Sequence, residues 1–283
     1  MSSPSAVRGE HVDIGGRTLR VVRAGPPGDQ PLVVCEHGAF GCASDWAVVA
    51  EKLALRGLRT LAYDRAGLGF SEPGPAPRDG AALRADRAAL LTALGETGPF
   101  VSIGHSMGGL MARLFALERP DAVLGLVLVD AITPDMIDLP GGGAAVSGFS
   151  QILRLASVGA QVGLMHGVSR ISANLIGLTG EAAREKQEIH ALASHARWAA
   201  EEVAGWRATS ALAAAELPPD LPVAVITAGA MQGWNPLKAR QVSPAEHSRR
   251  GYVEHVADCN HANLLGPDYA ETIVRAVDHV LAS

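Results

Sequence analysis

Hydrophobic positions along the chain follow two alternating patterns. Short continuous apolar runs are typical of strands that are covered on both faces of a sheet. Between these runs, apolar residues recur every three or four positions, which indicates amphipathic helices. The chain therefore predicts an α/β fold in which a mostly parallel central sheet is flanked by helices. The predicted strands are 11–14 and 18–23, which form an antiparallel hairpin, then 32–35, 60–63, the run that begins at Phe100, 123–129, 223–227 and 252–256.

The alternation stops between about 132 and 217, where the pattern predicts no strand. A glycine-rich hinge at 141–148 is followed there by helical spacing of apolar residues. We therefore expect a core domain formed by 1–130 and 218–283, with an inserted helical lid at 131–217. The helical patterns of the insertion cover 152–158, 162–178 and 182–215.

One strand-to-helix junction carries a candidate nucleophile. The strand that begins at Phe100 leads into Gly104-His105-Ser106-Met107-Gly108, and an apolar helix follows. Gly-x-Ser-x-Gly alone is a weak motif in a glycine-rich chain, and the surrounding strand and helix give it weight. Such a serine occupies a sharp, strained turn, with glycines leaving room for neighbouring chain. The pattern is that of a nucleophile elbow, with Ser106 at a helix N-terminus where amide groups stabilise negative charge.

A serine hydroxyl needs a base within hydrogen-bond reach, and histidine is the usual choice because it titrates near neutral pH. His261 lies after the last predicted strand and before the last helix, so it can reach the edge of the sheet that carries Ser106. His105, next to the serine, is expected to pack under the elbow. We predict His261 as the base, against the alternative of a surface-loop histidine.

Composition narrows the function further. The chain has 283 residues and a net charge of −5, which disfavours nucleic-acid binding. Its apolar runs are shorter than the ~20 residues of a membrane span, and 1–10 lacks the apolar core of a secretory signal. Three cysteines without metal-binding spacing indicate reduced thiols. We expect a cytoplasmic protein without metal, cofactor or membrane partner, acting on a small-molecule ester; a homodimer stays open.

Four short motifs occur at the ends of predicted strands. They are His37-Gly38-Ala39, Asp64-Arg65-Ala66-Gly67-Leu68-Gly69, the elbow, and Asn260-His261. In this order and rough spacing they resemble the α/β-hydrolase fold superfamily, in its serine-nucleophile esterase and lipase-like branch, over nearly the whole chain. The amide of Met107, after the nucleophile, supplies one oxyanion donor by geometry. The resemblance implies that Ala39 supplies the other, and that Asp64-Arg65 braces nearby loops.

The acid that orients the histidine departs from the pattern of that family. The resemblance most often places it after the strand that ends at Thr227, but 228–245 contains no Asp or Glu. Some relatives carry the acid after the preceding strand, which here ends at Asp130. We therefore expect Asp130 to complete the triad, against the alternative that it only caps the start of the insertion. Weaker candidates for the acid are Asp135, Asp258 and Glu36.

The resulting expectation is a serine hydrolase that cleaves a carboxylic ester through an acyl-enzyme. Few charges fall between Asp138 and Gly180, which favours a small to medium, uncharged and moderately apolar substrate. The same triad serves lactonases, amidases and C–C bond hydrolases, and a non-hydrolytic ligand-binding protein is a further alternative. An epoxide hydrolase or haloalkane dehalogenase needs Asp where this chain has Ser106. The expected substrate-binding residues are Phe40, His105, Met136 and Trp234.

Overall fold

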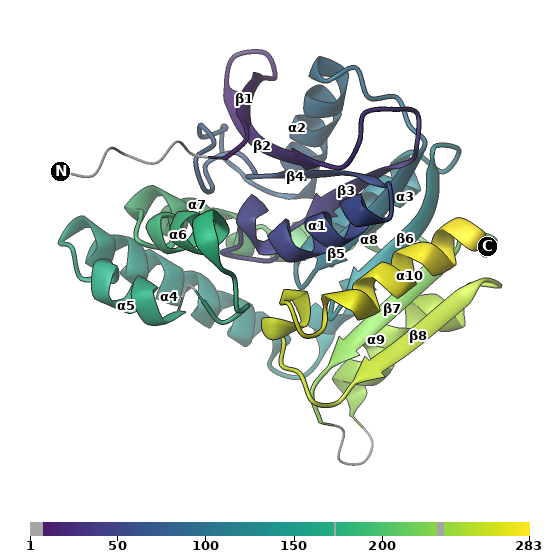
Figure 1. Cartoon of the computed structure of the whole chain (residues 1–283). Coiled ribbons are helices and arrows are strands. Elements are labelled where there is room, and N and C mark those ends of the chain that lie inside the picture. Colours follow the sequence, from purple (N-terminus) through teal and green to yellow (C-terminus); the bar gives the residue numbers. More distant parts are fainter. Residues whose placement is uncertain (1–7, 173, 231–234) are drawn as a thin grey trace.

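The computed structural model describes residues 8–172, 174–230 and 235–283. Eight strands form one sheet in the order β1-β2-β4-β3-β5-β6-β7-β8 (Figure 1). The first two strands form an antiparallel pair, β2 is antiparallel to β4, and the remaining pairs are parallel. The expected α/β fold with a mostly parallel sheet is therefore confirmed. The strands are β1 (Glu10–Asp13), β2 (Thr18–Ala24), β3 (Leu32–Glu36), β4 (Arg59–Tyr63), β5 (Phe100–His105), β6 (Val123–Val129), β7 (Val223–Ala228) and β8 (Gly251–Val256).

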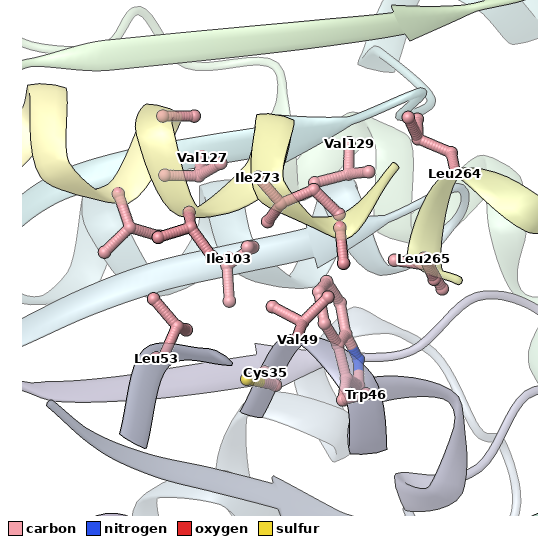
Figure 2. Close-up of a cluster of buried hydrophobic side chains, with 14 of the residues drawn as sticks. Cys35, Trp46, Val49, Leu53, Ile103, Val127, Val129, Leu264, Leu265 and Ile273 are labelled. Carbon is pink, nitrogen blue, oxygen red and sulfur yellow. The ribbon is translucent and has the colours of Figure 1, made fainter. Parts of the chain in front are cut away.

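Helices cover both faces of the sheet. On one face, α1 (Ala47–Leu55) and α10 (Ala270–Ala282) pack on the strands, and Figure 2 shows Trp46, Val49 and Ile273 meeting side chains of the sheet. This face buries 26 apolar residues in one cluster, so it anchors the central strands firmly. The other face carries α2 (Gly80–Ala93), α3 (Gly108–Glu118) and α9 (Pro236–Glu246).

The pairing of β3, β5 and β6 places the carboxyl ends of these parallel strands level with one another. Glu36 pairs with Gly104 between β3 and β5, and His105 pairs with Val129 between β5 and β6. The next residues along these strands are Ser106 and Asp130, so both emerge at the same edge of the sheet. Open parallel sheets bind ligands at this edge.

All the regular elements described between β6 and β7 are helices. Figure 1 shows α4 to α7 together at one end of the sheet. The predicted hinge at 141–148 is wrong, because α4 begins at Gly142 and the alanines that follow favour a helix. The helix predicted at 182–215 is divided at Leu192, which has extended angles, and at Gly205. Among the described helices, none is long and apolar enough for a membrane span. The elements are η2 (Pro134–Asp138), α4 (Gly142–Gln161), α5 (Met165–Ser172), α6 (Gly180–His190), α7 (Ala193–Ala204) and α8 (Trp206–Ala213).

Gly148 offers a test of the helix that replaces the predicted hinge. It lies inside α4, and a side-chain carbon added there would meet nothing within 4 Å. Alanine loses less backbone entropy than glycine in a helix, so Gly148→Ala should raise the free energy of unfolding by about 0.5–1 kcal/mol in urea titrations. The control is Gly141→Ala, which should lower it because Gly141 has a φ of 82°. A loss of stability in Gly148→Ala would contradict a helix at this position.

Candidate active site

The elbow holds Ser106 in a left-handed backbone conformation, with a φ of 55°. Such a conformation is strained for serine and persists only where neighbouring structure fixes it. A side-chain carbon at Gly104 would lie 2.3 Å from the Gly108 carbonyl oxygen, and one at Gly108 would lie 2.2 Å from that of Glu36. The motif glycines are therefore needed because three backbone segments approach each other closely around the half-buried serine.

His261 and Asp130 are joined by a hydrogen bond of 2.6 Å between Nδ1 and Oδ2. Because an ionised carboxylate only accepts, Nδ1 of His261 carries the proton in this bond, and in the neutral ring Nε2 is then the nitrogen that can accept one. Burial alone would raise the pKa of Asp130, but hydrogen bonds from His261 and Lys238 outweigh it and hold that pKa well below its ordinary value. The His261 side chain is 52% exposed, so its free edge is accessible to a ligand.

His105 connects this pair to the elbow. Its Nε2 donates to the His261 carbonyl oxygen at 2.8 Å, and the two rings lie 4.5 Å apart between centroids. Burial lowers the pKa of His105 to about 3, so its ring is neutral near pH 7. Within the described residues no hydrogen bond joins Ser106 Oγ to His261; the residue beside Ser106 makes the direct contact. His105 itself is buried, and its expected contact with substrate stays a prediction.

The other acids considered for the triad are engaged elsewhere. Glu36 is buried and accepts hydrogen bonds from Tyr63 and Arg87. Asp135 is paired with Arg240 on the surface. Asp258 is exposed, and its backbone oxygen accepts from the Tyr269 hydroxyl. Among the acids in the described part of the chain, Asp130 alone accepts a hydrogen bond from the His261 ring.

The loop after β3 lies directly beside the serine, since a side-chain carbon at Gly38 would be 3.0 Å from Ser106 Cβ. Arg65 fixes this loop by donating to the His37 carbonyl oxygen at 2.8 Å and to that of Gly38 at 3.2 Å. Glu202 of α7 holds the same guanidinium at 2.8 Å, and both of these side chains are buried. The expectation that Asp64-Arg65 braces loops is consistent with these contacts.

The expected oxyanion donors lie on the two segments that flank Ser106. In the hydrogen bonds between described residues, neither the Ala39 amide nor the Met107 amide has an acceptor. An unpaired N–H beside a nucleophile can donate to the oxyanion of a tetrahedral intermediate. Their role in an oxyanion hole remains a prediction.

Two histidines from the segment between β6 and β7 pack against the ring of Phe40. The backbone of Phe40 is left-handed, with a φ of 56°. The ring centroids of His190 and His195 lie 4.6 Å and 4.5 Å from that of Phe40. His195 Nδ1 accepts from the Gly69 amide at 3.0 Å, so its Nε2 carries the proton and points to the Phe40 carbonyl oxygen at 3.3 Å. The helices α6 and α7 thereby help to hold the loop beside Ser106.

An apolar cluster surrounds the elbow. Met107 belongs to it, and the half-buried Phe40, Ile132 and Phe149 pack against it. Met136 lies in η2 and is buried. Trp234 lies outside the described residues. The roles of Phe40, Met136 and Trp234 in binding substrate stay predictions.

A cavity of about 650 Å³ in the described part of the chain lies elsewhere. It is bounded by η2, α8 and α9, with Arg113, Asp138 and Pro218 among its lining residues, and it contains none of the candidate triad. This cavity is therefore separate from the candidate site, which lies at the carboxyl ends of β5 and β6, where parallel sheets usually bind ligands.

Sequence reasoning missed two residues that contact Asp130. Lys238 Nζ donates to Asp130 Oδ1 at 2.6 Å, and Gln241 Nε2 donates to the same oxygen at 3.1 Å. Both lie on α9, most of which falls within the acid-free stretch 228–245. The sequence Asn235-Pro236 is a signal that could have found Lys238, because Asn followed by Pro is typical of a helix start. It places Lys238 in the first turn of α9.

The match to a known family covers residues 31–213, which fit the alpha/beta hydrolase fold family. Since this is more than half of the chain, the protein belongs to that family. The sn-1-specific diacylglycerol lipase ABHD11 of Mus musculus is 41% identical over 101 residues, which are 35% of this chain and 32% of the lipase. The match thus spans about a third of that relative's length.

Solved structures give the same fold over nearly the whole chain. An epoxide hydrolase from Vigna radiata has a TM-score of 0.72 and 18% identity, covering 96% of this chain and 98% of its own. An enol-lactonase from Burkholderia xenovorans LB400 has a TM-score of 0.65 and 19% identity, covering 97% and 100%. At these identities the likeness establishes the fold alone.

The buried histidines predict a loss of stability in acid. Burial lowers the pKa of His190 to about 2 and that of His195 to about 4, so below about pH 6.5 the unfolded chain binds protons that the folded chain does not. Stability then falls as the pH falls, by up to about 1.4 kcal/mol per pH unit for each such histidine. His190→Leu should remove about one histidine's share of this slope between about pH 6 and pH 5, measured by urea unfolding.

The control for this measurement is His247→Leu. His247 is exposed on the surface after α9, so its replacement should leave the slope unchanged. Equal slopes for wild type and His190→Leu would contradict a neutral, buried His190.

Proposed function

We propose that this protein is a serine hydrolase that cleaves a carboxylic ester through a triad of Ser106, His261 and Asp130. The observation that carries the proposal is the 2.6 Å hydrogen bond between His261 and Asp130. His105, the residue before the strained Ser106, donates a hydrogen bond to the His261 backbone and so links the loop of His261 to the elbow. This arrangement provides a nucleophile, a base with a fixed tautomer and a buried anion in the order that acyl transfer requires. Membership of the alpha/beta hydrolase fold family supports a hydrolytic reaction of this kind.

In the proposed reaction, Ser106 Oγ attacks the ester carbonyl carbon while His261 Nε2 takes the hydroxyl proton. Asp130 stabilises the resulting imidazolium and does not itself take a proton. The amides of Ala39 and Met107 donate to the oxyanion, which is worth a few kcal/mol for each donor. His261 then gives its proton to the leaving alkoxide, and a water molecule repeats the sequence to release the acid.

The substrate we propose is small to medium, uncharged and moderately apolar. The side chains around the elbow are mostly apolar, with Phe40, Ile132 and Phe149 half-buried at its margin. Residues 139–180 of the segment predicted as a lid contain no Asp or Glu. The similarity to a diacylglycerol lipase is in keeping with an uncharged ester. Ser106 stands where an epoxide hydrolase needs Asp, so that reaction is not proposed.

Replacing the nucleophile tests the proposal directly. Ser106→Ala should lower the release of p-nitrophenol from short-chain esters by roughly 10⁴-fold or more, because the acyl-enzyme cannot form. Ser147→Ala, an exposed serine in α4, is the matched control and should keep wild-type activity. Assays with lactones and amides show whether esters are preferred. Ester hydrolysis that survives in Ser106→Ala would refute the proposed nucleophile.

Replacing the acid tests its assignment. Asp130→Asn should reduce kcat by roughly 10²–10⁴-fold, because an amide that donates to Nδ1 would move the proton of His261 to Nε2. Asp258→Asn is the control, since Asp258 is exposed and lies three positions before His261. A mild effect of Asp130→Asn together with a severe effect of Asp258→Asn would reverse the assignment.

A further inference from the structure

Helix α9, which follows β7 in the chain, places a lysine beside the candidate triad. Asn235 caps α9, accepting hydrogen bonds from the Leu237 and Lys238 amides, so Lys238 stands in the first turn of the helix. Its Nζ lies 2.6 Å from Asp130 Oδ1, and the two side chains are 17% and 8% exposed. Figure 1 shows α9 beside β7 and β8.

The two carboxylate oxygens of Asp130 have separate partners. Oδ2 accepts from His261, whereas Oδ1 accepts from Lys238, from Gln241 at 3.1 Å and from the Ala228 amide at 3.2 Å. Of the three donors to Oδ1, only Lys238 carries a full charge. A charged partner holds a carboxylate more strongly than a neutral donor, and it also acts on groups beyond that carboxylate.

We propose that Lys238 is a positioning residue that fixes the Asp130 carboxylate and sets the pH below which His261 stops acting as a base. This inference rests on the proposed hydrolase function. Lys238 touches neither Ser106 nor the His261 ring in the described contacts, so it acts through Asp130. Helix α9 thus contributes the countercharge of the acid, in the part of the chain where the family pattern most often has the acid itself.

The other groups that face the pair do not supply this charge. His105 contacts the His261 ring and is neutral because burial lowers its pKa to about 3. Cys259, two residues before His261, is neutral because burial raises the pKa of its thiol. The more distant Lys186 on α6 is paired with Asp45, and Arg240 on α9 is paired with Asp135. Asp258 is exposed to solvent, which screens its charge.

The sign of the effect follows from charge alone. A protonated His261 is a cation that cannot accept the serine proton, and a neighbouring lysine disfavours it. Removing Lys238 therefore makes protonation easier, and the acid limb of the pH–rate profile moves to higher pH. Across one carboxylate and two hydrogen bonds, roughly 7 Å, with an effective dielectric constant near 20, we expect a shift of roughly 1–2 pH units.

The experiment is the pH profile of kcat/KM with a p-nitrophenyl ester for four variants. Lys238→Met should move the acid limb upward, and Lys238→Arg should restore the wild-type limb because it keeps the charge. Gln241→Met removes a neutral donor from the same oxygen, so it should lower the plateau without moving the limb. Arg240→Met removes a charge from the same helix that does not touch Asp130, and its limb should also stay in place.

Two outcomes would overturn the inference: an unmoved limb in Lys238→Met, or an equal shift in Arg240→Met, which would mean that net charge alone is responsible. A structural role alone would lower the rate without moving the limb. If the wild type hydrolyses no ester, the proposed function fails, but the inference can still be tested. The His261 titration is then followed by NMR, where Lys238→Met should raise its midpoint by the same amount.

Discussion

The hydrogen bond from His261 Nδ1 to Asp130 Oδ2 links the loop after β8 to the end of β6, and the geometry of the candidate site depends on it. Both Asp130, with a φ of 40°, and Ser106, with a φ of 55°, adopt left-handed backbone angles where their strands end. Each such conformation costs on the order of 1–3 kcal/mol, which the surrounding sheet must offset. The buried apolar cluster on the α1 and α10 face holds the central strands in place, so the strain can be maintained at the edge.

A second constraint is that buried charged side chains need partners of opposite charge. The candidate site has two such buried charges, Asp130 and Arg65, and each has a partner from another segment of the chain. Asp130 is compensated by Lys238, Gln241 and a backbone amide, all from the β7–α9 region. Arg65 is compensated by Glu202 of α7 while it holds the carbonyl groups of the loop beside Ser106. Removing one partner of a buried pair leaves an unpaired charge, so each pair ties a distant segment to the site. The helices between β6 and β7 therefore contribute to the candidate site, since α7 supports the loop that carries Ala39.

The sequence allowed the sheet, the elbow and the pairing of His261 with Asp130 to be predicted, because each rests on local pattern and on the rule that parallel strands end at one edge. The absence of Asp and Glu from 228–245 excludes the usual position of the acid and points to Asp130. Lys238 is not predictable in the same way, although its helix cap is visible in the sequence, because the position of an acid does not reveal which cation pairs with it. The Arg65–Glu202 pair joins positions 137 residues apart, which no local pattern reveals. The hinge predicted at 141–148 is wrong because glycines are tolerated within a helix when the residues between them can form one, as they do at the start of α4.

The central claim is that Asp130 keeps the proton of His261 on Nδ1 and leaves Nε2 free to accept one. ¹⁵N NMR of the His261 imidazole near neutral pH measures this directly, because a protonated ring nitrogen and a bare one have distinct chemical shifts. A protonated Nδ1 and a bare Nε2 are expected in the wild type, and the reverse in Asp130→Asn. A wild-type ring protonated on Nε2, or one unchanged by Asp130→Asn, would contradict it.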